Sequence, residues 1–305
     1  MTTTEIRYDR FVWRNIVLPT PSDIDGLRRS YPFIHPLNLE DLLSQTERPK
    51  IDEGDEYLFV VMQFPVWDKR SRISRPSEVE FILGRNFLVT VHDGGLKPLV
   101  ELFQRCSQES SERQRFMARG ANDAFYMIVD QLVDYIFPIL HKVDQNIHAI
   151  EDQIFDGSTR DLITQIAVVR RDIIALRRII RHLVPILEAL ERTEHPIIRE
   201  DLEEYFGDTV DHIYRTRDII DENAEVIAGL SETADTLISH RTNEIIRVLT
   251  IISVVFMPLT LVSGIYGMNI GLPLDEHPLA FIVVVGFMLT IVIFMLFFFR
   301  HRGWI

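Results

Sequence analysis

Two long runs without charged residues lie close together near the C-terminal end of this sequence. Residues 248–266 and 279–299 contain no Asp, Glu, Lys or Arg, whereas charged residues make up 25% of the 305-residue chain. At 1.5 Å per helical residue, each run is long enough to cross about 30 Å of hydrocarbon. We therefore expect two membrane-spanning helices after a large polar and acidic part, residues 1–247. A buried helical hairpin in a soluble core is the alternative, and runs of this length fit it less well.

The charges that flank the two runs predict their orientation in the lipid bilayer. The connecting segment contains Asp275 and Glu276 but no Lys or Arg. Both outer flanks are basic, with Arg241 and Arg247 before the first run and Arg300 and Arg302 after the second. By the positive-inside rule, both termini then lie in the cytoplasm and the connecting segment lies outside. Because the N-terminal residues lack the apolar region of a signal peptide, we expect a multi-pass protein of the cell inner membrane.

Composition argues against several classes of function. A net charge of −13 argues against a nucleic-acid partner, because phosphate contacts need clustered Lys and Arg, whereas an acidic chain suits cations. The single cysteine, Cys106, excludes a disulfide scaffold, and we expect it to be an inert structural thiol. The sequence contains no HExxH, P-loop or GxSxG motif, so we do not expect an enzyme.

The pattern along the chain predicts an α/β domain, a helical region and a long stalk helix. Residues 5–17 and 57–92 carry β-branched and aromatic runs between turn residues, which indicates strands within an α/β domain of residues 1–95. Helical spacing predicts a helical hairpin region over residues 96–195 and a stalk helix over residues 196–247, with Pro196 in its first turn. The remaining expected segments are a first span (248–266), an external loop (267–278), a second span (279–299) and a basic cytoplasmic tail (300–305).

The expected stalk carries a seven-residue apolar repeat on an otherwise acidic helix. The repeat, which is typical of coiled-coil-like packing, consists of Phe206, Ile213, Ile220, Ile227 and Ala234. The acidic residues either form a solvated face or meet carboxylates of a neighbouring chain, where their repulsion would require a cation between them. An arginine-rich run before the stalk is expected to pair with acidic stalk residues or with neighbouring subunits. This run comprises Arg170, Arg171, Arg177, Arg178 and Arg181.

Two spans per chain cannot enclose a water-filled path, so the spans either anchor the protein or assemble from several chains around an axis. Small and polar residues on adjoining sevenfold positions of the first span are expected of a pore wall and equally of helix packing, which uses the same residue types. This stripe contains Asn243, Ile246, Thr250, Ser253, Met257, Thr260, Gly264 and Gly267. The stripe contains no carboxylate, so a Mg²⁺ ion would pass along it with its water shell. Leu249 and Met257 would form apolar constrictions in the path.

Short motifs around the first span resemble the CorA family of divalent-cation channels. Tyr266-Gly267-Met268-Asn269 follows the first of the two C-terminal spans, as the GMN signature of that family does. Residues 247–252 (RVLTII) and 256–260 (FMPLT) match the elements that precede it. The resemblance extends over roughly the full length of the chain through residues 35–41 (HPLNLED), 48–50 (RPK), 205–208 (YFGD), 211–212 (DH) and 241–244 (RTNE).

The resemblance implies a funnel-shaped homopentamer that conducts Mg²⁺, and in addition Co²⁺ and Ni²⁺, passively through the membrane. Cytoplasmic Mg²⁺ bound between subunits would close it, with Asp208 in the regulatory metal site and Asp68 as the candidate partner on the neighbouring α/β domain. The implied selectivity filter is Gly267, Met268 and Asn269. The implied path has Asn243 as an inner polar ring, Leu249 and Met257 as a hydrophobic gate, and Thr260 and Gly264 as lining residues.

The external loop departs from the acidic element that follows GMN in the family, and this departure leaves the identity of the ion open. Residues 270–278 (IGLPLDEHP) do not align their glutamate with that element. Copies of Asp275 and Glu276 would still attract cations, and the adjacent His277 leaves room for a softer metal. A Zn²⁺ transporter of the ZntB branch, with or without proton coupling, is therefore one alternative. A non-conducting, membrane-anchored coiled-coil sensor is the other.

Overall fold

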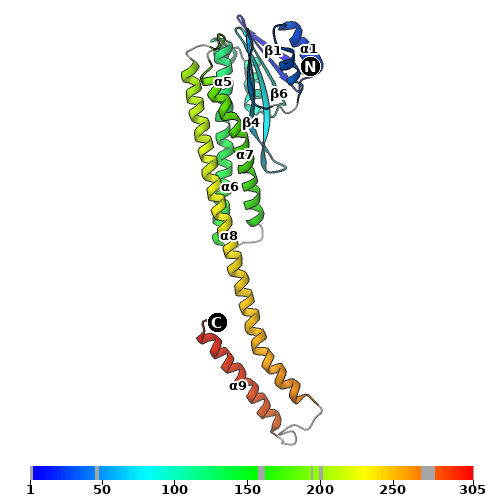
Figure 1. Cartoon of the computed structure of the whole chain (residues 1–305), viewed down its shortest axis with the longest axis vertical. Helices are drawn as coiled ribbons and strands as arrows, with labels where there is room; N and C mark the ends of the chain where they lie inside the picture. The colour runs from blue at the N-terminus through cyan, green and yellow to red at the C-terminus, as the bar shows by residue number, and fades with distance from the viewer. Residues whose placement is uncertain are drawn as a thin grey trace. The chain divides into compact units, whose positions relative to one another are not determined.

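The computed structural model describes residues 3–44, 48–156, 162–193, 195–198, 202–268 and 279–304. It divides into two compact units, Met1–Ser231 and Glu232–Ile305, and helix α8 (Leu202–Tyr266) contributes to both. The first unit combines a β-sheet with long helices (Figure 1), and the second contains apolar helices. The predicted combination of an α/β domain, a long stalk helix and C-terminal apolar helices is confirmed.

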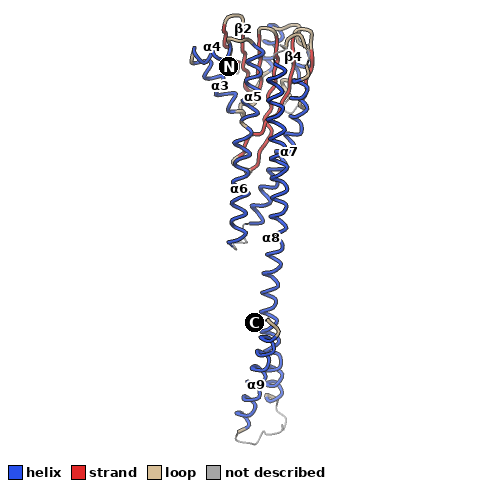
Figure 2. Tube along the Cα trace, turned by 90° about the vertical axis from the view of Figure 1, so that its left-hand side faces the viewer, coloured by secondary structure: helices blue, strands red, loops and turns tan. Residues whose placement is uncertain are grey.

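The α/β domain is built on a six-stranded mixed sheet, drawn in red in Figure 2. The strands lie in the order β1-β2-β6-β5-β4-β3, and the β2–β6 pair is parallel while the other neighbouring pairs are antiparallel. Their bounds are β1 (Thr3–Tyr8), β2 (Phe11–Val17), β3 (Lys50–Glu53), β4 (Tyr57–Asp68), β5 (Ile73–Gly84) and β6 (Phe87–His92). The sequence pattern did not predict β3, because its residues KIDE are short and polar.

Two short helices cover one face of the sheet. They are α1 (Pro21–Ser30) and α2 (Pro36–Asp41). Thr20 and Asp23 form a capping box at the start of α1, where Pro21 occupies the first turn. Ile24 and Leu27 then face the sheet and pack in one buried cluster with Phe59 and other strand residues.

Further helices cover the opposite face of the sheet, and their aromatic side chains interlock with it. Trp13 stacks on Phe116 at 5.1 Å between ring centroids, and Phe81 meets Phe125 at 5.1 Å edge to face. Cys106 is buried in this layer, and burial raises the pKa of its thiol to about 11, as expected of an inert thiol. These helices are α3 (Lys97–Gln108), α4 (Ser110–Met117), α5 (Ala121–Asp134), α6 (Ile136–Asp156) and α7 (Leu162–Glu191).

Helix α8 buries its heptad stripe as the repeat predicted. Phe206, Ile213, Ile220, Ile227 and Ala234 are each at most 2% exposed. The ring of Phe206 packs 6.0 Å from that of Phe125 on α5. Apolar burial on this scale is worth about 1.5–3 kcal/mol for each large side chain, so the stripe holds the first part of α8 against the other helices.

Polar contacts support the packing of α7 and α8. Arg177 on α7 donates to Asp221 on α8, with Nε and Nη2 at 2.9 and 2.8 Å from Oδ1. The expectation that the arginine-rich run pairs with acidic stalk residues is therefore confirmed for Arg177.

The prediction that Pro196 lies in the first turn of the stalk helix is wrong, because Pro196 lies in a turn. His195 fixes this turn to the α/β domain. Its Nε2 lies 2.8 Å from the carbonyl oxygen of Gly54, and its Nδ1 accepts a hydrogen bond from the backbone of Ile197 at 3.3 Å. These two contacts of the His195 imidazole stabilise a turn at residues 195–197 instead of an extension of the stalk helix to Pro196.

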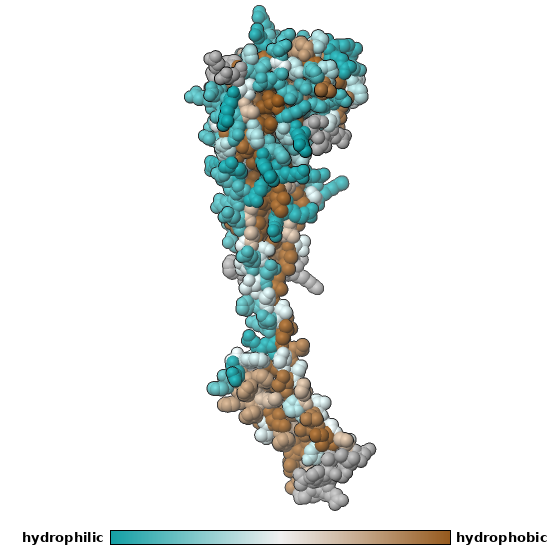
Figure 3. Space-filling model, viewed as in Figure 1, coloured by the Kyte–Doolittle hydropathy of each residue, from teal (hydrophilic) through white to brown (hydrophobic). Residues whose placement is uncertain are grey.

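The second unit contains the C-terminal part of α8 and helix α9 (Ala280–His301). Their most apolar windows have mean hydropathies of 2.4 and 3.0. In residues 248–266 and 280–301, Val255 and Phe299 are buried and the other side chains are at least partly exposed. Figure 3 shows apolar side chains, in brown, over this part of the chain. Both helices are thus long enough and apolar enough to cross a membrane.

One buried carboxyl group in the sheet gives the domain a distinct dependence on pH. Glu80 on β5 is 4% exposed, and burial together with the neighbouring Glu78 carboxylate raises the pKa of Glu80 to about 9. Gln63 on β4 donates to the carboxylate of Glu78 at 3.1 Å. At pH 7, Glu80 is therefore protonated in the folded protein and ionised in the unfolded chain, where its pKa is near 4.5. Stability must fall as pH rises from about 4.5 to about 9, because the folded state has to take up a proton.

We expect Glu80→Gln to stabilise the protein at neutral and alkaline pH, because glutamine keeps the buried polar group but needs no proton. The melting temperature of the detergent-solubilised protein should rise by at least about 2 °C at pH 8, which corresponds to ~1 kcal/mol in a domain of this size. The gain should be much smaller at pH 5. Glu56→Gln, at an exposed position, is the matched control. An equal gain at both pH values would contradict the assignment.

Candidate conduction segment and regulatory carboxylates

The polar residues of the first apolar run all lie on α8, and their hydroxyl groups bond back to the helix. Thr250, Ser253 and Thr260 each donate to the carbonyl oxygen four residues earlier, at 2.7–2.9 Å. Such bonds satisfy the hydroxyl proton within the chain and leave the oxygen lone pairs to accept from water. The helix therefore presents acceptor oxygens without any charged group. This suits contact with the water shell of a cation rather than direct coordination.

Five of the predicted site residues line one groove on α8. The groove has a volume of about 670 Å³ and includes Ser253, Met257, Thr260, Gly264 and Met268. Met257 is 71% exposed, and Leu249, one of the two predicted gate residues, is also exposed. Asn243, Ile246, Leu249 and Thr250 lie on the same helix outside this groove. Apolar side chains left open in this way must be covered by lipid or by other protein chains.

Pro258 interrupts the hydrogen bonding of α8 beside this groove. A proline in the helix interior has no N–H to donate to the carbonyl four residues earlier, which here belongs to Val254. An intramembrane carbonyl freed in this way is tolerated where water or neighbouring protein can satisfy it. The free carbonyl oxygen of Val254 is therefore a further polar group of this segment. Pro258, which leaves it free, belongs to the sequence element FMPLT.

The signature motif begins at the end of α8. The helix ends at Tyr266, and the amides of Gly267 and Met268 donate to the carbonyl oxygens of Ser263 and Ile265 at 2.9 and 3.2 Å. A Cβ at Gly267 would come within 3.1 Å of the carbonyl oxygen of Ser263, which favours glycine at this helix terminus. The predicted residues Asn269, Asp275 and Glu276 lie outside the described residues.

Asp208 lies within a cluster of carboxylates around one imidazole. His212 Nε2 is 3.9 Å from Asp208 Oδ2, and His212 Nδ1 is 3.4 Å from Asp134 Oδ1 on α5. Burial and the negative charges of Asp134 and Asp208 raise the pKa of Asp130, also on α5. The sequence analysis missed Asp130 and Asp134, because they lie more than one helix away along the chain. Their spacing of four residues, which places them on one helix face, was the available signal.

Asp68, the second predicted regulatory residue, is engaged in the turn between β4 and β5. It accepts hydrogen bonds from the Ser71 hydroxyl at 2.6 Å and from the Arg70 amide at 3.0 Å, and it pairs with Arg75 at 2.5 Å. The hydrogen bonds from Ser71 and Arg70, with the Arg75 charge, lower the pKa of Asp68 to about 2. The structure thus does not bring Asp68 and Asp208 to a shared partner within the described part of one chain. A group of three or more His, Cys, Asp or Glu placed to hold a metal ion is likewise absent from the residues described.

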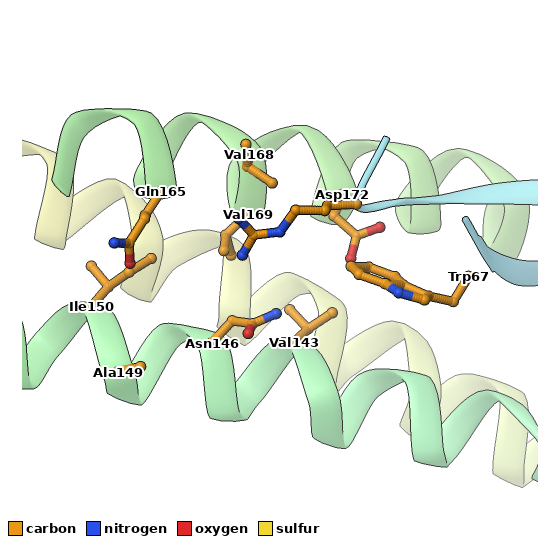
Figure 4. A pocket seen from close by; sticks show the side chains of 10 residues that line it. Trp67, Val143, Asn146, Ala149, Ile150, Gln165, Val168, Val169 and Asp172 are labelled. Atoms are coloured by element: carbon orange, nitrogen blue, oxygen red, sulfur yellow. The ribbon is translucent and has the colours of Figure 1, made fainter. Parts of the chain in front are cut away.

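A small cavity between α6, α7 and the β4–β5 hairpin belongs to the core rather than to an ion site (Figure 4). Its volume is only about 40 Å³. The buried carboxylate of Asp172 accepts a hydrogen bond from the Ser74 amide at 2.5 Å, and Lys142 lies over the Trp67 ring at 4.6 Å. These contacts explain how a buried acid is tolerated between the helices and the hairpin.

An α/β domain, a long helix with a buried heptad stripe and two apolar helices, the first with a groove that carries hydroxyl groups but no charged residue, together match a membrane transporter for cations. The profile of the family described as CorA-like Mg²⁺ transporter protein matches residues 8–301. The chain belongs to this family and is a divalent-cation transporter of the membrane. The family predicted from the GMN and FMPLT motifs is confirmed.

Individual relatives agree with this assignment. YfjQ of Bacillus subtilis (strain 168) is 30% identical over 286 residues, which cover 93% of this chain and 87% of YfjQ. The cobalt/magnesium transport protein CorA of Thermotoga maritima is 28% identical over 303 residues, covering 96% of this chain and 85% of that protein. The complete structure of the CorA magnesium transporter from Methanocaldococcus jannaschii has the same fold, with a TM-score of 0.85 at 23% identity over 99% of this chain and 94% of that chain.

Proposed function

We propose that the chain is one subunit of a homopentameric, passive Mg²⁺ channel of the cell inner membrane, which also admits Co²⁺ and Ni²⁺. The observation that carries this proposal is the open groove on α8, whose lining places the hydroxyl groups of Ser253 and Thr260 among apolar side chains and contains no carboxylate. Mg²⁺ releases its waters reluctantly, so a path of hydroxyl, amide and carbonyl oxygens can pass the hydrated ion without trapping it. A single groove cannot enclose water, so several copies of α8 must face a common axis.

The segments then take the following roles. Residues 1–95 and 96–195 form the cytoplasmic domain, and residues 202–247 of α8 form the stalk. Residues 248–266 line the pore, residues 279–299 form an outer span, and both termini lie in the cytoplasm, including the basic tail at 300–305. Asn243, Thr250, Ser253, Thr260 and Gly264 contact the water shell, and Ile246 lines the same path. Leu249 and Met257 close the path by excluding water. Residues 267–278 form the external mouth, where Gly267, Met268 and Asn269 select the ion and Asp275 and Glu276 attract it.

Cytoplasmic Mg²⁺ closes this channel by binding between subunits at Asp208. The carboxylates of Asp130, Asp134 and Asp208 influence one another around His212, and a divalent cation would relieve their repulsion. Asp68 of a neighbouring subunit is the candidate partner of Asp208. To bind Mg²⁺, the Asp68 carboxylate must give up part of its ion pair with Arg75. When Mg²⁺ falls, the repulsion returns and loosens the interface.

Asn269→Ala should abolish ion entry into liposomes that contain the purified protein, because five amides at the outer mouth would be lost together. We expect Mg²⁺ entry in the unmodified protein to follow the membrane voltage, at about 2.3 kcal/mol per charge per 100 mV, and to ignore a proton gradient. The flux is measured for Mg²⁺ and Zn²⁺ separately. Zn²⁺ entry driven by an inward proton gradient, with little Mg²⁺ flux, would favour the zinc alternative, and no flux of either ion would favour the non-conducting sensor.

Asp208→Asn should weaken closure by cytoplasmic Mg²⁺ without changing the ion that passes. We expect the Mg²⁺ concentration that halves the flux to rise by about tenfold, the effect of losing ~1.4 kcal/mol of binding energy. Asp218→Asn removes another exposed carboxylate of α8 and is the matched control, which should close as the unmodified protein does. Asp68→Asn tests the partner. If closure is unchanged in Asp68→Asn but weakened in Asp208→Asn, the partner assignment is wrong while the regulatory site stands.

A further inference from the structure

Two grooves of the cytoplasmic unit run along different flanks of α8. The first lies between α7 and α8, has a volume of about 360 Å³ and includes Arg217 and Ile220 of α8. The second lies between α6 and α8, has a volume of about 510 Å³ and includes Ile219 and Glu222 of α8. Each residue of the second pair follows one of the first by two positions, which is a turn of about 200° around the helix. The two grooves therefore lie on opposite sides of α8.

Helix α7 carries arginines with no partner beside its groove. Arg178 and Arg181 are exposed and make no ion pair within the described part of the chain, whereas Arg177 is bonded to Asp221. Ile174 on the same helix is 58% exposed. Arginine next to exposed aliphatic groups is typical of protein interfaces, because the guanidinium binds carboxylates while the stem packs on apolar surface. We call Arg178 and Arg181, which are three residues apart on one helix face, the arginine face.

The groove on the other side of α8 has the opposite charge, and we call it the acidic groove. Its described lining contains Asp144, Glu151 and Glu222 but no Lys or Arg. Three carboxylates in one groove repel one another, and cationic side chains of another molecule would relieve this repulsion. Val226, which also lines the groove, is 39% exposed and adds apolar surface.

A buried amide gives independent support for a partner in the acidic groove. Asn223 lines the groove and is only 7% exposed, and its Nδ2 has no hydrogen-bond partner among the residues that the structure describes. Because Nδ2 is a donor, it requires an oxygen acceptor. A partner surface must therefore bring an acceptor together with cations. The α7 side of the molecule has both, since Glu188 and Arg181 line the same groove.

We infer that the acidic groove of one copy receives the arginine face of the next copy, so that subunits associate head to tail around α8. The two faces in contact are different, and contacts of this kind close into a ring when the rotation permits. Subunits of a closed ring are related by rotation without translation along its axis, so residues at the same height meet. Arg181 shares its groove with Ile220, which places it at the height of Glu222 in the next copy.

This contact rests on the proposed function, which requires several copies around one axis, and it specifies which surfaces of the subunits meet. Asp208, the proposed Mg²⁺ ligand between subunits, lies about three helical turns before Ile219 and hence on the acidic side of α8. The regulatory carboxylates and the acidic groove then belong to one continuous interface. Cation binding at Asp208 and pairing of the arginine face stabilise the same association.

Cysteine cross-linking of the full-length protein in liposomes tests the contact. The natural Cys106 is buried and the pKa of its thiol is raised, so it should not react. Arg181→Cys and Glu222→Cys are introduced into separate chains, which are co-expressed and treated with a short bismaleimide. We expect covalent dimers of the two variants, and no dimer from either variant alone, because identical faces do not meet. Arg119→Cys, exposed in the turn between α4 and α5, is the matched control for Arg181→Cys and should give no dimer with Glu222→Cys.

Reversal of charges tests the electrostatic part of the contact. In Arg181→Glu, the protein concentration at which the detergent-solubilised oligomer half dissociates should rise by about tenfold, because a carboxylate then faces the acidic groove. Light scattering measures this dissociation. Glu222→Arg in the same chain should restore the original value, because every interface then has the same pair in reverse.

Absence of the mixed dimer in a protein that is oligomeric and conducts Mg²⁺ would overturn this contact and leave the proposed channel standing. Dimers formed by Glu222→Cys alone would also overturn it, because identical faces would then meet. A monomeric protein would contradict both proposals. Mixed dimers in a protein without Mg²⁺ flux would support the contact and contradict conduction.

Discussion

Helix α8 has to satisfy two different environments along one backbone, and the other elements follow from this requirement. Its first part buries Phe206, Ile213 and Ile220 against protein, whereas its last part is apolar and not buried. A helix can pass from one environment to the other because its backbone hydrogen bonds are internal and need neither water nor a partner strand. Helices α5–α7 then act as the surface that covers the heptad stripe, which a lone amphipathic helix could not bury.

The distribution of carboxylates along α8 matches the chemistry expected of a hydrated divalent ion. Acidic residues are frequent in the polar part of the helix, whereas the groove of the apolar part has two hydroxyl groups among apolar side chains and no carboxylate. Carboxylates bind Mg²⁺ strongly enough to hold it, which suits regulation and hinders conduction. Neutral oxygens in the apolar part avoid both the cost of burying charge and the trapping of the ion. Under the proposed function, the same helix therefore combines sensing and passage by separating the two kinds of ligand.

Periodicity predicted the elements of this fold better than the contacts between them. The sevenfold repeat identified the buried residues of α8 one by one, because a repeat of this length leaves little freedom in which face is covered. The short polar strand β3 gave no comparable signal, and the turn at Pro196 depends on a contact between His195 and Gly54, which are far apart in the sequence. Asp134 reaches His212 for the same reason, through the packing of α5 on α8. Local patterns specify which residues a helix buries, whereas only the packed structure shows which polar groups meet.

The carboxylates around His212, the proposed regulatory site, carry an electrostatic cost within one chain. Asp130 titrates above its ordinary range, since burial and the charges of Asp134 and Asp208 disfavour its ionised form, while His212 offers partial compensation. A protein that needed only stability would replace such a cluster with neutral residues, because like charges at close range oppose folding. Retaining the charges makes sense when a cation is present in some states and absent in others. The repulsion between the carboxylates then raises the free energy of the cation-free state relative to the cation-bound state. A gate controlled by cation concentration requires such a difference in free energy.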